Sequence, residues 1–410
     1  MAGLEDLLST RAAFGMRLGL NRMRLLLAAL GEPQRAFRAI HVVGTNGKTS
    51  TTLFAAAILE AHGLVAGAYI SPHVYGFRER VQVGGAPLAE DVLAAAVARV
   101  EAAAAGVDAA ADEPLTQFEV LTAAAFVALA SAGVEAAVVE AGLGGRYDAT
   151  NVLDAPVVAL TNVGLDHVEQ LGGTREAIAA EKLAVVAPGV DLVAGSVDAE
   201  IEGVIRSLSG HAGSVHMLRP GSDVADAPPL AARGRFQREN LALALVACEL
   251  LLGDRFDRPR AIGAAARVVV PGRLQTIGAA PLVLVDGAHN PHGARALAAE
   301  LPAAVGDRTP LVGVIAILAD KDVDGVLDAL APRLQAAVAT QSASPRALPA
   351  ADLAARIAAR GVPTEAVTPP SAALARARER AGPTGAVLVS GSLSLLEQLA
   401  PLLVQAAEAR

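Results

Sequence analysis

Arg38-Ala-Ile-His-Val-Val-Gly-Thr-Asn-Gly-Lys-Thr-Ser-Thr-Thr52 is the stretch that decides the fold. Its apolar run predicts a buried strand that breaks at Gly44, and the residues from Gly47 onward predict a helix. A strand, a glycine loop and a helix in this order point backbone N–H groups and a helix N-terminus at a phosphate. We therefore expect the ammonium of Lys48 to reach the terminal phosphates of a nucleotide.

Two hydroxyl residues, Thr49 and Ser50, follow this lysine, and one of them would meet Mg²⁺ in a phosphate-binding loop. The match is incomplete, because Val42 stands where the general pattern has its first glycine. Taken alone, the stretch also suits an ordinary strand–turn–helix without a nucleotide. The rest of the chain has to distinguish these two interpretations.

Length and charge limit the possible classes of protein. A chain of 410 residues is too long for one ordinary core, so we expect two domains. The formal net charge is −8, from 34 Lys and Arg against 42 Asp and Glu, and no basic tract is present. Nucleic acid is therefore not expected as a partner. Anionic substrates would have to be held by local lysines, arginines and metal ions.

Cysteine content and the N-terminus bear on the compartment. Cys248 is the only cysteine, which excludes an internal disulfide and a cysteine-based zinc cage. Glu5 and Asp6 come early, and the first residues lack an apolar signal core. No apolar run has the length of a membrane-spanning helix without a charge or a glycine. We expect a cytoplasmic protein that does not bind membranes.

Polar side chains follow several other predicted strands of the first half. Ser71-Pro72-His73 follows a strand at 65–70, and Asp166-His167 follows a strand at 156–160. Glu140 ends an all-apolar strand and is followed by the glycine-rich loop 141–151. A buried carboxylate is costly unless a cation meets it, and Mg²⁺ is the obvious candidate beside a glycine loop. The alternatives are a simple turn at residues 71–73 and a hydrogen-bonded core histidine at 167.

Two helices of the first half carry signals of their own. Thr116 and Glu119 form a capping-box pattern at the start of a helix that also carries Phe118. A later helix at 174–186 carries Glu181 and Lys182, for which a surface ion pair is the ordinary interpretation.

Strands alternate with helices throughout, and the rhythm restarts after Pro271-Gly272-Arg273, which predicts a hinge at about 267–275. This alternation indicates parallel sheets in both halves. We therefore divide the chain into residues 1–270 and 271–410.

The ordered set of motifs resembles the folylpolyglutamate synthase/dihydrofolate synthase branch of the Mur ligase family. The resemblance covers almost the whole chain, from Gly15 to Gly391-Ser-Leu393. It rests on nine motifs: His41 to Thr52, Ser71 to His73, Thr116 to Glu119, Glu140 to Asn151, Gly164 to His167, Glu181-Lys182, Pro271 to Arg273, Asp286 to Pro291 and Asp320 to Asp322.

The resemblance implies an α/β fold with two parts and a reaction in the cleft between them. The first is a P-loop-containing N-terminal domain with a central, mainly parallel sheet and a folate site. The second is a smaller, Rossmann-like C-terminal α/β domain that carries the glutamate-ligase function. A monomer is expected.

The resemblance also implies the residues of the site. Those expected to bind ATP are Gly44, Thr45, Asn46, Gly47, Lys48, Thr49, Ser50, Asn240, Arg273, Asp286 and His289. Those expected to bind two Mg²⁺ ions are Ser71, Glu140, His167 and Lys182, the lysine as a carbamate. Those expected to bind substrate are His73, Phe118 and Asp148, and those expected to act in catalysis are Lys48, Lys182 and His289.

The reaction implied is ATP-dependent formation of a C–N bond through an acyl phosphate, adding L-glutamate to folates and also to dihydropteroate. Two alternatives are a Mur-type ligase that extends a peptidoglycan precursor and a nucleotide-binding regulator without turnover. The Asp148-to-Asn151 stretch and the Asp286 motif favour folate over murein substrates. Nothing in residues 1–37 resembles a separate domain that would bind a nucleotide-linked murein precursor.

The chain departs from the branch in three places. Thr49-Ser50 replaces the more frequent Gly-Ser, which leaves open which hydroxyl contacts the metal ion. Phe236-Gln237 replaces His-Gln before Asn240, and Leu183-Ala184 replaces Ala-Gly after the lysine. These differences concern nucleotide contacts and loop shape.

Overall fold

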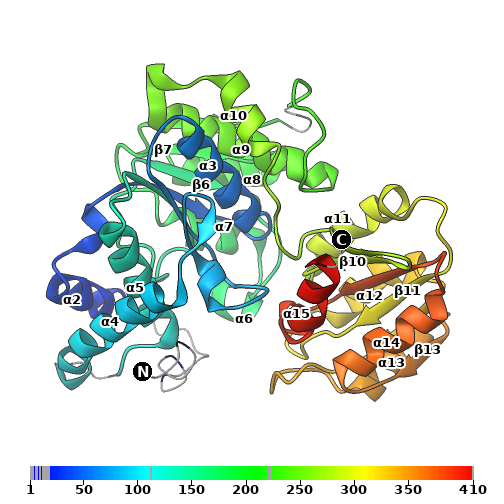
Figure 1. Cartoon of the computed structure of the whole chain (residues 1–410). Helices are drawn as coiled ribbons and strands as arrows, with labels where there is room; N and C mark the ends of the chain where they lie inside the picture. The colour runs from blue at the N-terminus through cyan, green and yellow to red at the C-terminus, as the bar shows by residue number, and fades with distance from the viewer. Residues whose placement is uncertain are drawn as a thin grey trace.

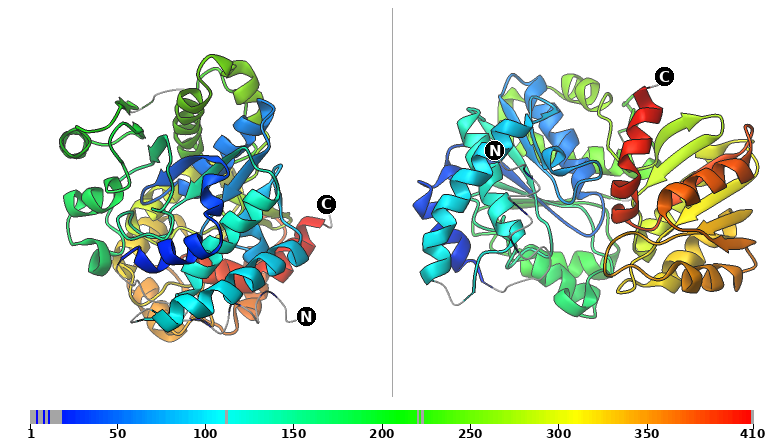
Figure 2. Two further views of the ribbon diagram at one scale, coloured as in Figure 1. Left: turned by 90° about the vertical axis from the view of Figure 1, so that its left-hand side faces the viewer. Right: turned by 60° about the horizontal axis from the view of Figure 1, so that its bottom comes forward.

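Two sheets with helices on both faces build the protein, which we describe from a computed structural model (Figure 1). The structure describes residues 19–110, 113–219, 221 and 224–408, together with Leu4, Leu8 and Arg11. An eight-stranded sheet has the order β4-β3-β2-β5-β1-β6-β7-β8, and a six-stranded sheet has the order β13-β12-β11-β14-β10-β9. The two sheets belong to two bodies that lie side by side (Figure 2).

The strands of the first sheet are β1 (Arg38–Val43), β2 (Ala66–Tyr69), β3 (Val81–Val83), β4 (Ala86–Pro87), β5 (Ala136–Glu140), β6 (Val157–Leu160), β7 (Asp191–Ala194) and β8 (Ser214–Met217). The α-helices around it are α2 (Asn21–Ala29), α3 (Lys48–Ala61), α4 (Glu90–Ala110), α5 (Gln117–Ser131), α6 (Val168–Leu171), α7 (Arg175–Leu183), α8 (Ala199–Leu208), α9 (Arg235–Leu252) and α10 (Arg258–Ala265).

The strands of the second sheet are β9 (Gln275–Ala279), β10 (Leu282–Asp286), β11 (Leu311–Ile315), β12 (Ala336–Ala339), β13 (Thr364–Ala366) and β14 (Ala386–Ser390). Its helices are α11 (Pro291–Val305), α12 (Val323–Leu330), α13 (Ala350–Ala358), α14 (Pro370–Ala381) and α15 (Leu393–Glu408).

Both sheets are parallel in their centres, as the strand–helix alternation predicts. The antiparallel pairings lie at one end of each sheet: β3 pairs antiparallel with β2, β4 with β3, and β9 with β10. Central strands are apolar on both faces because helices cover both sides of the sheet. In β5, for example, Val138 packs into the core under α3 and α9, whereas Val139 packs into the core under α4 and α5.

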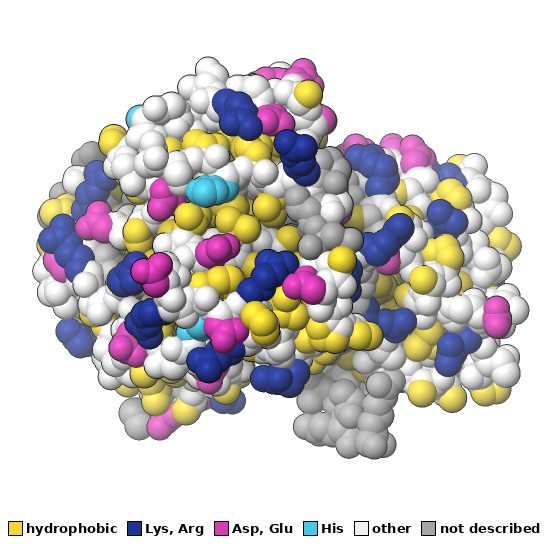
Figure 3. Space-filling view, turned by 90° about the horizontal axis from the view of Figure 1, so that it is seen from above, with side chains coloured by type: hydrophobic (Ala, Val, Ile, Leu, Met, Phe, Trp, Pro, Cys, Tyr) yellow, Lys and Arg dark blue, Asp and Glu magenta, His cyan; other side chains and the backbone are white. Residues whose placement is uncertain are grey.

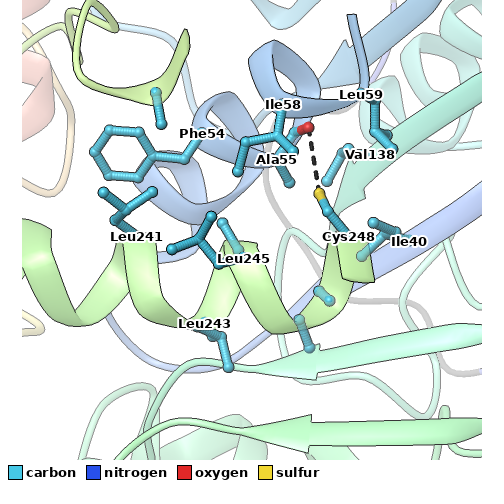
Figure 4. Close-up of a cluster of buried hydrophobic side chains, with 14 of the residues drawn as sticks. Ile40, Phe54, Ala55, Ile58, Leu59, Val138, Leu241, Leu243, Leu245 and Cys248 are labelled. Atoms are coloured by element: carbon cyan, nitrogen blue, oxygen red, sulfur yellow. Dashed lines mark hydrogen bonds between the residues drawn. The ribbon is translucent and has the colours of Figure 1, made fainter. Parts of the chain in front are cut away.

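Helices α3 and α9 pack on each other and on one face of the first sheet. Figure 4 shows Phe54, Ile58, Leu241 and Leu245 interdigitating in this core. Each such side chain contributes roughly 1.5–3 kcal/mol through removal of apolar surface from water. Cys248 lies in the same core, fully buried, with its thiol 3.5 Å from the carbonyl oxygen of Ala55. Burial raises the pKa of this thiol. The packing of α9 against α3 holds α3, the helix that follows the glycine loop, in place.

Most predicted elements are present, with shifted ends. The expected helix at 88–106 runs from Glu90 to Ala110, and the capping box of Thr116 and Glu119 is formed at the start of α5. Of the helix expected in residues 1–37, the structure shows α2, whereas Leu7 and Met16 lie outside the described residues. Strands β3, β4, β8 and β9 and helices α6 and α10 were not predicted from the sequence, and two strand–helix pairs (β12, α13, β13 and α14) stand where one was predicted.

The arrangement of the sheets brings several strand ends together. In the first sheet β1 lies between β5 and β6, and their carboxyl ends lead into the glycine loop, Glu140 and the Asp166-His167 loop. In an open α/β sheet, ligands bind at the carboxyl ends of adjacent strands whose connections diverge. The fold therefore gathers the polar segments named above at one edge of the first sheet.

Charged side chains of both signs are mixed on the face of the molecule seen from above (Figure 3). Figure 3 shows cationic and anionic side chains interspersed on one face, without a broad basic area among the side chains coloured there. Among the described residues, no helix is long and apolar enough to cross a membrane.

Candidate active site

A cavity of about 250 Å³ lies where the first sheet faces the second body. Every residue predicted to bind the nucleotide or the metal ions lines it. These are Gly44, Thr45, Asn46, Gly47, Lys48, Thr49, Ser50, Ser71, Glu140, His167, Lys182, Asn240, Arg273, Asp286 and His289. Residues distant in sequence and drawn from both bodies thus meet around one space, which a set of unrelated turns would not do.

The glycine loop adopts the conformation that a phosphate cradle requires. Gly44 and Gly47 have φ angles of 145° and 86°, in the left-handed region that favours glycine. A Cβ atom at Gly44 would lie 1.8 Å from the Thr161 hydroxyl oxygen, and one at Gly47 would lie 2.3 Å from the Asn240 side-chain oxygen. Helix α3 then begins at Lys48, so its N-terminus faces the cavity. The position of Val42 in strand β1 does not prevent this loop from forming.

The hydrogen-bond acceptors of the Lys48 ammonium are neutral backbone groups. It donates hydrogen bonds to the carbonyl oxygens of Gly44 and Thr45, both at 3.2 Å. The side chain is thus curled over its own loop. A phosphate in the cavity would offer this ammonium charged acceptors in place of neutral carbonyls.

Glu140 is a buried carboxylate that forms no salt bridge with the described residues. Its oxygens accept hydrogen bonds from the Thr49 hydroxyl and from the Ser71 backbone N–H, each at 3.2 Å. Burial raises the pKa of Glu140 to about 7, although the nearby Lys48 charge acts in the opposite direction. A carboxylate at a strand end with this shortage of countercharge suits a divalent cation.

Lys182 lies in the cavity and not on the surface. Only 3% of its surface is exposed, and its ammonium donates to the carbonyl oxygen of Gly44 at 2.8 Å. Burial and the neighbouring Lys48 lower the pKa of Lys182 to about 7. Glu181 pairs with Arg146 at 2.9 Å, so the surface ion pair considered for Glu181 and Lys182 is not formed.

His167 and Asp166 lie where the two bodies meet. Asp166 contacts three groups of the second body: Lys321 at 2.6 Å, Asn290 at 2.8 Å and His289 at 3.4 Å. Burial opposes ionisation, but the hydrogen bond and charge of His289 and the charge of Lys321 hold the pKa of Asp166 well below its usual range. Burial lowers the pKa of His167 to about 4, so its imidazole is neutral at neutral pH.

The second body supplies Asp286 and Arg273 to the cavity wall. Asp286 ends strand β10 and accepts hydrogen bonds from the backbone N–H groups of Leu274 and Ala288, at 2.7 and 2.8 Å. Burial raises the pKa of Asp286, and the Arg273 charge counteracts this. The carboxylate therefore fixes the turn that carries Arg273 and the loop that carries His289.

The three predicted substrate residues are not among the residues that line the cavity. Asp148 is buried and accepts from the backbone N–H of Leu143, at 2.8 Å, and from the hydroxyl of Thr150. The ring of Phe118 packs against Gly142, where a Cβ atom would approach to 2.5 Å. His73 bonds to Arg80 and to Glu397. All three shape the loops around the site, and their contact with substrate stays a prediction.

Several residues in or near the site had no predicted role. Asp166, Lys321 and Asn290 belong to motifs noted in the sequence, and their charge or amide groups were the available signal. Arg80 and Glu397 lie outside those motifs and were not found. Their importance depends on how the two bodies meet, as the bond between His73 and Glu397 at 3.1 Å shows.

The predicted ligands fit a divalent cation if they include a serine hydroxyl and a carbamylated lysine beside the glutamate and the histidine. Among the described residues, no group of three or more His, Cys, Asp or Glu side chains is close enough to hold a metal ion. Glu140 and His167 supply two of the common ligand types, and both line the same cavity. A site would be completed by a serine hydroxyl and by a lysine converted to an anion. Oxygen donors of this kind suit Mg²⁺ or Mn²⁺.

Comparisons with known proteins agree with this geometry. Residues 42–191 match the Mur ligase middle domain, and residues 272–393 match the Mur ligase, glutamate ligase domain. A dihydrofolate synthase/folylpolyglutamate synthase of Mycobacterium tuberculosis is 36% identical over 367 residues, covering 80% of this chain and 75% of the relative.

Solved structures are similar over nearly the whole chain. The folylpolyglutamate synthase of M. tuberculosis complexed with ADP has a TM-score of 0.89 and 33% identity, covering 98% of this chain and 97% of the other. A bifunctional folylpolyglutamate synthase/dihydrofolate synthase with Mn, AMPPNP and L-glutamate bound has a TM-score of 0.82 and 30% identity, covering 98% of both chains. These similarities agree with the site, in which a glycine loop, a strand-end carboxylate and a buried lysine share one cavity between the two bodies. The chain belongs to the folylpolyglutamate synthase/dihydrofolate synthase branch of the Mur ligase family.

Proposed function

We propose that this chain binds ATP and a divalent cation and adds L-glutamate to folates, and also to dihydropteroate. The observation that carries the proposal is the cavity itself, because all predicted nucleotide and metal residues of both bodies line it. Its relatives support the substrates: one is named for both ligase activities, and another was solved with Mn, a nucleotide analogue and L-glutamate. The peptidoglycan alternative has no such support.

The chemistry is amide formation through an acyl phosphate. The carboxylate of the acceptor attacks the γ-phosphate of ATP, and ADP leaves. The amine of L-glutamate then attacks the acyl carbon, phosphate leaves, and the nitrogen releases one proton as the amide forms. Both steps bring anions together, so positioning and countercharge lower the barrier. Lys48 and the N–H groups of its loop supply part of that countercharge, and Arg273 supplies more from the second body.

Two Mg²⁺ ions would be held by Ser71, Glu140, His167 and a carbamylated Lys182, and would provide electrostatic stabilisation of the phosphates. The buried, weakly basic Lys182 supports the modification. Its pKa of about 7 leaves much of the amine unprotonated at neutral pH, and an unprotonated amine adds CO₂ with release of one proton. The product would be an anion beside Lys48, where the unmodified lysine places a second cation.

We place the domain boundary between residues 270 and 271. Val270 is buried in the core of the first body, whereas Leu274 is buried in the core of the second. The intervening residues belong to neither core, which supports the predicted hinge at about 267–275. ATP would contact both sides of this hinge, so closure would shield the acyl phosphate from water. A cytoplasmic monomer stays our expectation.

Incubation of the purified chain with ATP, Mg²⁺ and radiolabelled L-glutamate tests this function. Separate reactions contain dihydropteroate, tetrahydrofolate or a murein precursor as acceptor. We expect labelled product and stoichiometric ADP with both pteridine acceptors. Product with only one of them would limit the chain to one activity. ATP binding without product from any acceptor would contradict the ligase proposal.

A further inference from the structure

Lys321 connects the second body to the residue pair Asp166-His167 in the first. Its ammonium lies 2.6 Å from an Asp166 carboxylate oxygen and 3.1 Å from Nε2 of His167. The side chain of Lys321 is 7% exposed, so solvent competes little for these contacts. Lys321 comes from the loop before α12, which only a domain contact brings to this place.

The contact with Lys321 determines which ring nitrogen of His167 carries the proton. A lysine ammonium has donors and no acceptor, so Nε2 must accept through its lone pair. The ring is then neutral, with its proton on Nδ1. His167 also has a φ of 51°, a left-handed conformation that is uncommon for residues other than glycine. The backbone N–H of His167 donates to Asp166 at 2.9 Å, which holds this conformation.

A metal ion would need the same lone pair. Histidine binds a divalent cation through an unprotonated ring nitrogen, and one nitrogen cannot serve an ammonium and a cation at once. The Nδ1 nitrogen carries the proton in this arrangement and is not available. Lys321 at Nε2 and a cation at Nε2 are therefore mutually exclusive.

We infer that Lys321 is a positioning residue that occupies the Nε2 nitrogen of His167 until a divalent cation displaces it. The inference rests on the proposed role of His167 as a metal ligand. Lys321 places a positive charge at Nε2 of His167, occupies the lone pair there, and ties the second body to Asp166. Ion binding then exchanges one contact of the domain interface for a bond to the cation.

Binding of Mn²⁺ to the full chain without nucleotide tests this exchange, with electron paramagnetic resonance as the readout. Four proteins form a double-mutant cycle: the natural chain, Lys321→Met, His167→Ala and the double variant. We expect Lys321→Met to tighten Mn²⁺ binding about tenfold, because the ion no longer breaks a charge-assisted hydrogen bond. In the His167→Ala background, the same substitution should change affinity less than about twofold.

The alternatives give different results. A purely structural lysine would weaken Mn²⁺ binding when removed, and this result would overturn the inference. A tightening that persists in the His167→Ala background would mean general charge repulsion and would also overturn it. Arg295→Met is the matched control, because Arg295 and Lys321 line the same neighbouring cavity. An equal tightening from Arg295→Met would again indicate general repulsion.

Two further measurements keep the test decisive. Lys321→Leu, which likewise carries no donor for Nε2 of His167, replaces Lys321→Met if that variant fails to fold. If His167→Ala alone leaves Mn²⁺ affinity unchanged, His167 is not a ligand, and the inference fails with that assignment. The ligase activity with folate acceptors would remain established separately by product formation.

Discussion

Glu140 gives the most direct test of the proposed site. Substitution Glu140→Gln keeps the shape and the hydrogen bond from the Ser71 N–H but removes the charge. Because the carboxylate would hold the cation, we expect turnover to fall by at least about 10³-fold. Product formation and Mn²⁺ affinity should be measured on the same preparation. Near-normal consumption of ATP in the presence of folate and glutamate would contradict the role.

Lys182 tests the modification. Lys182→Ala should be inactive, because the proposed carbamate and its negative charge could not form. Added acetate or another short carboxylate should restore part of the activity by entering the space left by the side chain. Lys182→Arg is the control, since arginine fills that space and cannot form the carbamate. Full activity of Lys182→Ala without additives would show that no carbamate is needed.

The strand–loop–helix unit makes its own prediction through Gly44. A side chain there would collide with the Thr161 hydroxyl, which lies 1.8 Å from the position of a Cβ atom. Gly44→Ala should therefore displace the loop, and we expect nucleotide affinity to fall by about tenfold or more. Isothermal titration with ADP measures this. Gly63→Ala, at the other end of α3, serves as the control, because Gly63 also has a positive φ, of 82°, but has no neighbour within 4 Å of its Cβ position.

Strand β1 should also make the fold sensitive to acid. His41 is buried in this strand, and burial lowers its pKa from 6.5 to about 4. As the pH falls below 6.5, His41 takes up a proton in the unfolded chain, whereas in the folded protein it does so only near pH 4. The contribution of His41 to the free energy of unfolding is therefore complete above pH 6.5 and decreases as the pH is lowered from 6.5 to 4. The loss at roughly pH 5 amounts to about 2 kcal/mol.

Urea unfolding of the natural chain and of His41→Gln, in neutral and in mildly acidic buffer, measures this loss. Glutamine retains a partner for Thr150, whose hydroxyl lies 2.8 Å from Nε2 of His41. We expect the natural chain to lose more stability on acidification than the variant. Equal losses in both proteins would assign the acid sensitivity to other groups.

For the two-domain arrangement, the contact between His73 and Glu397 is a test of closure. Arg80 donates to Nδ1 of His73 at 2.8 Å, so the imidazole presents Nε2–H to Glu397 of α15. Glu397→Ala removes this link, and we expect the affinity for nucleotide to fall about fivefold through a less populated closed state. Small-angle X-ray scattering should show a smaller compaction on adding nucleotide. If nucleotide compacts Glu397→Ala as much as it compacts the natural chain, the contact does not contribute to closure.

The fold was largely predictable because local patterns determine it. Apolar runs that end in glycine or in a charged residue identified β1, β5, β6 and β10, and the carboxyl ends of adjacent parallel strands necessarily meet. The predicted nucleotide and metal residues therefore line one cavity. Strands β3 and β4 were not predicted, because three and two residues are too few to show a period. Strand β8 carries an exposed His216, and it shows no apolar run.

What the sequence could not predict depends on long-range placement. Asp166 has its partners in the second body, at Asn290 and Lys321, more than 100 residues away. No local pattern reports how two domains face each other. The same holds for Glu397, which contacts His73 across 324 positions of the chain.

The buried position of Cys248 between α9 and α3 has a practical consequence for following the hinge. Its thiol is fully buried, and burial also raises the pKa of the thiol, so we expect no reaction with maleimides in the native state. Engineered surface cysteines, one on each body, can thus be labelled with a donor and an acceptor dye without removing the natural one. Single-molecule energy transfer in the labelled chain would then test whether the two bodies open and close at the proposed hinge when ATP and substrates are present.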